Sequence, residues 1–263
     1  MFYQFISFYI GMAKYYSWRC CRKALFFVFA LLFTSQAMAQ VNYKGGSNVQ
    51  LLYGRSLNQS GQLATITLEH FGDLGAFEHF GFADLYNDAS LAAPNLYLEW
   101  YPKLSLSRAT GRNVSLGPIS DVLVGGGMNV LFGGDQDFFV YTAGPAFKFR
   151  LPGQGLLQFE TYYYKQQGSE YNGTYQFTPS WDIPIPVSER LRFRFRGFMD
   201  FIGDRGPGTT QYLTQPQLHV DLGNFWDKPG KVYVGSEWRY WRNVVGIAGL
   251  DESILQANVL FSL

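Results

Sequence analysis

The sequence is poor in the residue types that staple small folds or bind metals. Its two cysteines, Cys20 and Cys21, lie near the N-terminus, and the 263 residues include three histidines. A disulfide scaffold and a cysteine- or histidine-based metal centre are therefore excluded as the basis of the fold. Charge is also scarce, because charged residues make up 16% of the chain whereas aromatic residues make up 18%. A water-soluble domain of this size usually carries more charge.

Long apolar runs are missing too. After residue 39, no segment stays apolar over the about 20 residues that a membrane-spanning helix needs. A shorter apolar run at 24–33 follows a basic stretch at 19–23 and precedes an A-x-A site at 37–39. This layout is typical of a secretory signal peptide. We predict a cleaved signal peptide over 1–39 and one mature domain over 40–263, with an uncleaved anchor as the alternative.

Removal of the signal peptide changes the charge balance of the chain. Residues 1–39 contain both cysteines and several basic residues but no acidic residue. The mature chain therefore has no thiol and a small excess of acidic groups, which is not the balance of a nucleic-acid-binding protein. We expect no nucleic-acid partner.

Strict alternation of apolar and polar residues is the main pattern that the mature sequence does contain. From Asn95 to Ser107, one face carries leucines and Trp100, and the other carries Tyr97, Glu99, Tyr101 and Lys103. Such a period of two predicts a strand, since helical periodicity would separate these residues. Pro102 lies in this segment and cannot donate to a sheet, so a bulge or bend is expected there.

A second clear alternation runs from Arg190 to Phe201. Phenylalanines alternate there with Arg192, Arg194 and Arg196. An arginine that faces lipid at mid-membrane costs about 2–4 kcal/mol. If the chain spans a membrane, the arginine row must face a watery interior.

The last residues, SILQANVLFSL, again place apolar residues at every second position, with Leu260 and Ile254 as exceptions on the polar face. This pattern is typical of the closing strand of an outer-membrane barrel, and its expected partner is the first strand, near Val49–Tyr53. Other alternating segments, separated by Gly-, Pro- and Asp-rich turns, bring the total to about twelve. The predicted fold is all-β: a transmembrane antiparallel β-barrel of about 12 strands, in outer-membrane lipid after insertion by the barrel-assembly machinery.

Residues that could carry catalysis are sparse. Neither His70, His79 nor His219 lies in a serine–histidine or metal-ligand pattern. The glycine run at 125–127 lacks the lysine and helix of a phosphate loop. We therefore expect a protein that is no enzyme and needs no metal or cofactor. A phospholipase-like barrel enzyme and a plugged structural or phage-receptor barrel remain alternatives.

The predicted inner faces mix aromatic side chains with charges of both signs. Such a wall could hold a flat polar heterocycle, which stacks on the rings and forms hydrogen bonds to the charged groups. Equally, opposed charges could pair across the lumen and fill it. With both signs present, the sequence predicts neither a cation- nor an anion-selective lumen. The wider set of wall candidates includes Lys148, Arg150, Glu160, Tyr162, Tyr164, Glu237 and Arg239.

Three segments resemble a known family. TLEHFG (67–72), FGFADLY (80–86) and YLEWYPKLSLSRATGRNVSLGPISDV (97–122) are similar to the nucleoside-specific channel-forming outer-membrane proteins, the Tsx-like family. The resemblance implies a twelve-stranded monomeric barrel that admits nucleosides by passive diffusion. The chain departs from that family in its shorter loops and in its final residue, Leu263, where an aromatic is usual.

By position, the resemblance puts Glu69, Phe82, Asp84, Glu99 and Lys103 on the channel wall. Together with the alternation, it leads to the predicted solute-binding lumen residues, which are Glu69, Phe82, Asp84, Tyr97, Glu99, Tyr101, Lys103, Arg192, Arg194 and Arg196.

Overall fold

The computed structural model describes residues 44–263 apart from 59–60, 89–94, 134–137, 153–154 and 169. The predicted signal peptide, 1–39, lies outside the described residues. The strands are β1 (Lys44–Ser56), β2 (Gln62–Leu74), β3 (Phe77–Asp88), β4 (Asn95–Ser105), β5 (Ile119–Phe132), β6 (Phe138–Phe149), β7 (Leu156–Gln166), β8 (Thr174–Pro186), β9 (Arg192–Ile202), β10 (Gln211–Thr214), β11 (Gln217–Asp221), β12 (Val232–Arg242) and β13 (Glu252–Ser262). Three short helical turns, α2 (Leu106–Thr110), η1 (Gly223–Trp226) and η2 (Val244–Gly246), lie in connections.

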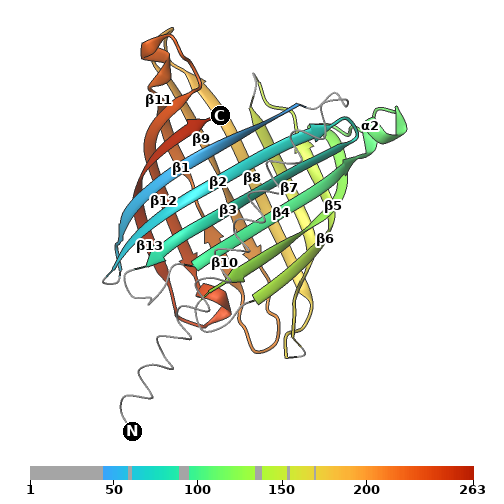
Figure 1. Cartoon of the computed structure of the whole chain (residues 1–263). Helices are drawn as coiled ribbons and strands as arrows, with labels where there is room; N and C mark the ends of the chain where they lie inside the picture. The colour runs from blue at the N-terminus through green and yellow to red at the C-terminus, as the bar shows by residue number, and fades with distance from the viewer. Residues whose placement is uncertain (1–43, 59–60, 89–94, 134–137, 153–154, 169) are drawn as a thin grey trace, which may run out of the picture.

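The strands form one closed antiparallel sheet (Figure 1). Apart from β10 and β11, which do not pair with one another, the described strands pair with their sequence neighbours, and β1 closes the sheet onto β13, with Val49 opposite Phe261. Closure matters because unpaired backbone groups are not tolerated in lipid. The predicted pairing of the last strand with the first is confirmed.

The two short strands β10 and β11 together occupy the place of one strand in the barrel wall. Both pair with β9 on one side and β12 on the other. They are separated by Gln215 and Pro216, and proline lacks the N–H that a continuous ladder would need. The described chain therefore forms a barrel of 12 wall strands, which confirms the prediction of about 12.

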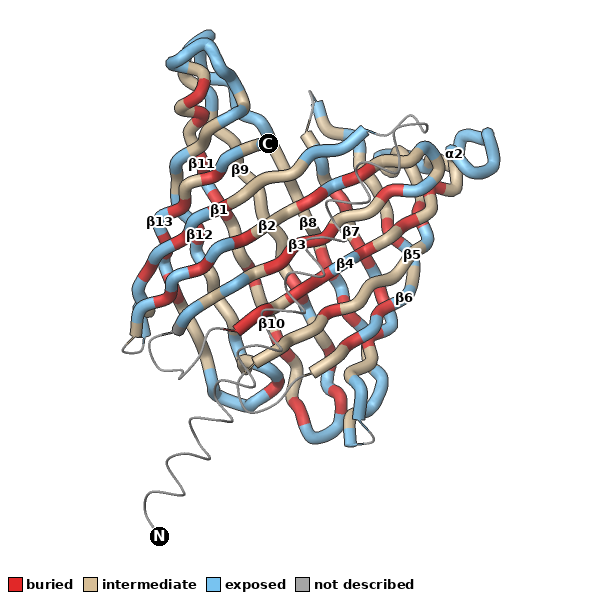
Figure 2. Tube along the Cα trace, viewed as in Figure 1, coloured by how far each residue is buried: buried red, intermediate tan, exposed pale blue. Residues whose placement is uncertain are grey.

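Buried and exposed residues alternate along the strands (Figure 2). The exposed residues include many large apolar side chains, and the buried ones include many polar side chains. On β1, Leu51 and Tyr53 are 46% and 57% exposed, whereas the alternate residue Gln50 is 1% exposed. The same inversion recurs on β13, where Leu255 is exposed and Asn258 is fully buried. An exposed apolar band over buried polar side chains fits a protein surrounded by lipid. No helix among the described residues is long and apolar enough to cross a membrane.

Two local predictions on β4 are wrong. The strand ends at Ser105, because Ser105 accepts a hydrogen bond from the Arg108 backbone N–H (3.1 Å) and caps α2. The predicted bulge at Pro102 is also absent, since β4 keeps the same offset against β5 on both sides of it, although the ladder between the two strands skips Tyr101 and Pro102. The irregularity lies on β5 instead, between Ile119 and Asp121.

The predicted arginine segment also begins later than expected. β9 starts at Arg192, and residues 187–191 form the turn from β8, in which Val187 and Ser188 donate backbone hydrogen bonds to Leu191 (3.0 Å each). The C-terminal residue lies at the same end of the barrel as α2 (Figure 1). That end is called the α2 end below, and the other is called the η2 end.

Candidate functional site

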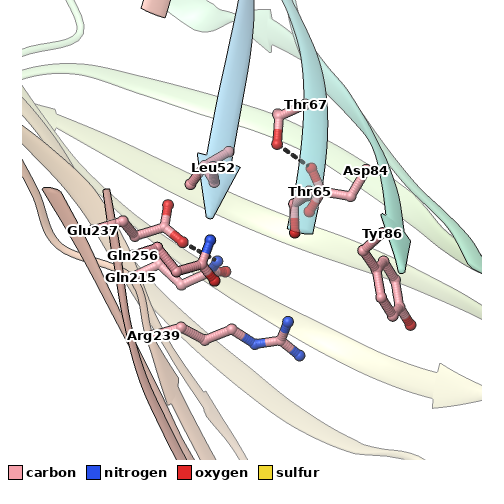
Figure 3. A pocket seen from close by; sticks show the side chains of 9 residues that line it. All are labelled: Leu52, Thr65, Thr67, Asp84, Tyr86, Gln215, Glu237, Arg239 and Gln256. Carbon is pink, nitrogen blue, oxygen red and sulfur yellow. Dashed lines mark hydrogen bonds between the residues drawn. The ribbon is translucent and has the colours of Figure 1, made fainter. Parts of the chain in front are cut away.

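The lumen contains a large cavity toward the α2 end. Its volume is about 590 Å³, and its lining runs from Gly46 and Ser262, near the α2 end, to Thr67 and Glu237 at mid-barrel. A second pocket of about 20 Å³ continues toward the η2 end (Figure 3). The two spaces share four lining residues, Thr67, Asp84, Gln215 and Glu237. The lumen is therefore wide in one half and nearly filled in the other.

Most of the predicted lumen residues line the large cavity. The lining includes Glu69, Phe82, Asp84, Glu99, Tyr101, Lys103, Arg194 and Arg196. Tyr97 stays off the lining; its hydroxyl donates to Glu99, and its ring centroid lies 6.0 Å from that of Phe82. Arg192 is the first residue of β9, at the end of the barrel wall. Its side chain is exposed and is not part of the cavity lining.

An ion pair between β9 and β2 crosses the barrel. Arg196 Nη2 on β9 donates to both carboxylate oxygens of Glu69 on β2, at 2.8 and 2.7 Å. Asn48 Nδ2 donates to the same carboxylate at 2.6 Å. Strands β9 and β2 are separated by several strands in either direction around the sheet, so the contact spans the lumen. Part of the predicted wall is thus engaged in bracing the barrel.

A second crossing is made of uncharged groups around Gln50. Gln217 Nε2 and Asn258 Nδ2 donate to Gln50 Oε1 at 3.1 and 2.8 Å, and Gln217 Nε2 also lies 2.5 Å from Glu237 Oε2. The first two bonds join β11 and β13 to β1, and the third joins β11 to β12. Buried polar side chains in a low-dielectric interior are stable only when they are paired in this way.

An aromatic platform lies on one side of the cavity. The rings of Tyr101 and Tyr162 are stacked, with centroids 6.2 Å apart and an interplanar angle of 11°. Tyr101 also donates to Asn129 Oδ1 at 2.8 Å. A Cβ atom on Gly127 would lie 2.2 Å from the Tyr101 ring, so this glycine leaves room for the platform. The glycine run at 125–127 therefore has a packing role on this wall of the barrel.

Some cavity residues were missed by the sequence analysis. Glu78 pairs with Lys148, and Asp182 pairs with Arg194. Both acids continue alternations that were visible: Glu78 lies two and four residues before Phe80 and Phe82, all of which line the cavity. Extending the period-two pattern to the strand ends would have found them.

The geometry offers little for catalysis. Among the described residues, no group of three or more acidic, histidine or cysteine side chains could hold a metal ion. Ser47 Oγ lies 2.7 Å from His70 Nδ1, and the ring centroid of His79 lies 5.2 Å from that of His70. His219 is fully buried in the wall, edge-on to Tyr233.

No family model matches the chain. The outer membrane protein OmpK of Vibrio parahaemolyticus is 25% identical over 144 residues, which are 52% of this chain and 54% of OmpK. The chain therefore matches only about half the length of this curated relative.

Among solved structures, a NanC porin aligns over 82% of this chain and 100% of its own, with a TM-score of 0.50 and 9% identity. A KdgM porin aligns over 82% and 99%, with a TM-score of 0.48 and 7% identity. At such identities the likeness to NanC concerns the fold. The chain is an outer-membrane β-barrel of porin-like fold.

Proposed function

We propose that this protein is a passive channel of the outer membrane for small polar solutes. The observation that carries the proposal is the cavity of about 590 Å³ inside a closed barrel, lined by charged and aromatic side chains. Pockets of 300–1,000 Å³ are typical of small-molecule sites. Diffusion down a gradient needs no cofactor, and weak contacts with the wall would let a solute enter and leave.

Nucleosides are the solutes that we propose. A nucleobase can stack on aromatic faces such as Tyr101, Phe80 and Phe82, and ribose hydroxyls can donate to carboxylates such as Glu99. The resemblance of 67–122 to the Tsx-like family supports the same solute class. The closed sheet has no free edge among its described strands, which supports a monomer.

Planar-bilayer recording tests the channel, and solute uptake tests the nucleoside. Purified protein is expected to give discrete conductance steps. Adenosine should block them, and the block should saturate as the adenosine concentration rises. Liposomes that carry the protein should take up adenosine faster than a sugar of similar size. Equal uptake rates for the two solutes would contradict the proposed nucleoside preference and leave the proposed channel function intact.

A plugged receptor barrel is the second candidate, and a specific observation favours it. The contacts from Arg196 to Glu69 and from Gln217 to Gln50 cross the lumen, and the pocket toward the η2 end holds about 20 Å³. A barrel closed in this way would show no conductance at any voltage. The same bilayer recording therefore separates the two candidates.

A further inference from the structure

The charges that line the large cavity are unequal in number. Eight acidic side chains and four lysines or arginines belong to the described lining. The sequence had suggested a lumen with no preference between cations and anions, since both signs alternate along the strands. Which charges remain uncompensated depends on how the side chains pair in space.

Each of the four bases is already matched to an acid of the same lining. The pairs are Lys103 with Glu160, Lys148 with Glu78, Arg194 with Asp182, and Arg196 with Glu69. A base held in such a pair contributes little field at a distance, because the partner charge cancels it. Two of the three arginines of β9, Arg194 and Arg196, are therefore neutralised in the folded barrel.

The other four acids have neutral partners. Thr67 Oγ1 donates to Asp84 at 2.5 Å, and Tyr97 donates to Glu99. Thr178 Oγ1 and Gln176 Nε2 donate to Asp200 at 2.6 and 3.1 Å. Gln217 and Gln215 donate to Glu237 at 2.5 and 3.2 Å. Hydroxyl and amide donors stabilise a carboxylate without cancelling its charge.

Arg239 is a basic residue near two of these acids, but its ion pair is with a different acid. It lines the small pocket together with Asp84 and Glu237, which lie on different sides of that pocket (Figure 3). Arg239 Nε lies 2.8 Å from Glu252 Oε1 on β13. Among the described residues, no ion pair is formed by Asp84, Glu99, Asp200 or Glu237.

An independent observation points to a ligand that donates hydrogen bonds. Gln217 lines the cavity beside Glu237 and is only 8% exposed, yet its Oε1 has no hydrogen-bond partner among the described residues. A buried acceptor without a donor costs about 1–3 kcal/mol. This oxygen exposes almost no surface to the cavity, so the Gln217 side chain would have to rotate before a donor group of a solute could bond to it beside Glu237.

We propose that the lumen is cation-selective and favours solutes that carry an ammonium or guanidinium group, through the four unpaired carboxylates Asp84, Glu99, Asp200 and Glu237. The proposal rests on the channel function proposed above and names the charge class that this channel prefers. The carboxylates come from β3, β4, β9 and β12, so a solute meets negative charge on several sides of the cavity. Aromatic rings in the same lining can add cation–π attraction.

The reversal potential under a potassium chloride gradient across a planar bilayer measures this selectivity. Fixed charges that line a cleft raise local counter-ion concentration by about 10-fold or more, so we expect potassium to be at least about 10-fold more permeant than chloride. The charge-neutralising isosteres Asp84→Asn, Glu99→Gln, Asp200→Asn and Glu237→Gln should each lower that ratio, and together bring it to about one. The matched control is Glu189→Gln, an exposed acid of the β8–β9 turn, which should leave the ratio unchanged.

Three sugars of one ring size extend the test to solutes. Uptake into liposomes should be fastest for glucosamine, slower for glucose and slowest for glucuronate. A conducting channel with a ratio near one, or with chloride favoured, would overturn the cation preference and leave the channel standing. A protein that conducts nothing would overturn both. Because the unaltered protein decides the sign of the selectivity, the test does not depend on the folding of any variant.

Discussion

The two halves of the lumen are built from different side chains. Toward the α2 end, long charged side chains pair with one another and surround a cavity of about 590 Å³. Toward the η2 end, Leu52, Leu63, Ile254 and Gln256 are each 5% exposed or less, and the space among their neighbours is about 20 Å³. Charges leave room for water and solute, whereas aliphatic and amide side chains pack against one another and fill the barrel.

The largest effect is expected from the brace that crosses the wide half. Arg196→Met leaves the Glu69 carboxylate without its charged partner, and loss of one partner of a buried pair costs about 3–5 kcal/mol. The measurement is the free energy of unfolding in urea, with the protein in lipid vesicles. The double variant Arg196→Met/Glu69→Leu should recover much of the loss. If the single and double variants are equally stable, the crossing pair does not brace the barrel.

The next effect concerns the filled half. Leu52→Ala removes buried volume there, and such changes cost about 2–5 kcal/mol. The same change should enlarge the narrow pocket, so single-channel conductance should rise. Leu51→Ala, on the neighbouring lipid-facing position, is the control and should leave conductance unaltered. A conductance that stays constant in Leu52→Ala would mean that the narrow half does not limit flow.

A smaller effect is expected from the glycine under the aromatic platform. Gly127→Ala places a methyl group against the Tyr101 ring, and overpacking of this kind costs about 1–3 kcal/mol. The displaced ring should also weaken block of the channel by adenosine. Gly46→Ala is the matched control, since nothing lies within 4 Å of its added Cβ. Equal block in both variants would argue against Tyr101 as a stacking surface.

The smallest effect separates the Tyr101 ring from its hydroxyl. Tyr101→Phe removes the hydrogen bond to Asn129, which is worth about 0.5–1.5 kcal/mol, and keeps the stacking face. Adenosine block should therefore persist in Tyr101→Phe and fall in Tyr101→Ala. A loss of block in both would assign recognition to the hydroxyl rather than to the ring.

Much of the barrel could be predicted from the sequence because a strand has a period of two. The alternation at 95–107 and 190–201 predicted a set of inward-facing residues, of which Lys103 and Arg196 line the cavity whereas Tyr97 and Arg192 do not. Strand ends were harder to predict. Ser105 belongs equally well to an alternating strand or to a helix cap, and local hydrogen bonding decides between them.

By itself, the sequence determined the fold class and the composition of the lumen, since alternation assigns each side chain to lipid or interior whatever its neighbours are. The partners of the charges were decided by the tertiary structure. Arg196 meets Glu69, which lies 127 positions away, and Lys103 meets Glu160, whereas Asp84 meets a threonine. Strand tilt and register determine which side chains come into contact, and the alternation in the sequence gives neither the tilt nor the register. A sequence with charges of both signs thus folded into a lumen whose bases are paired and four of whose acids are not.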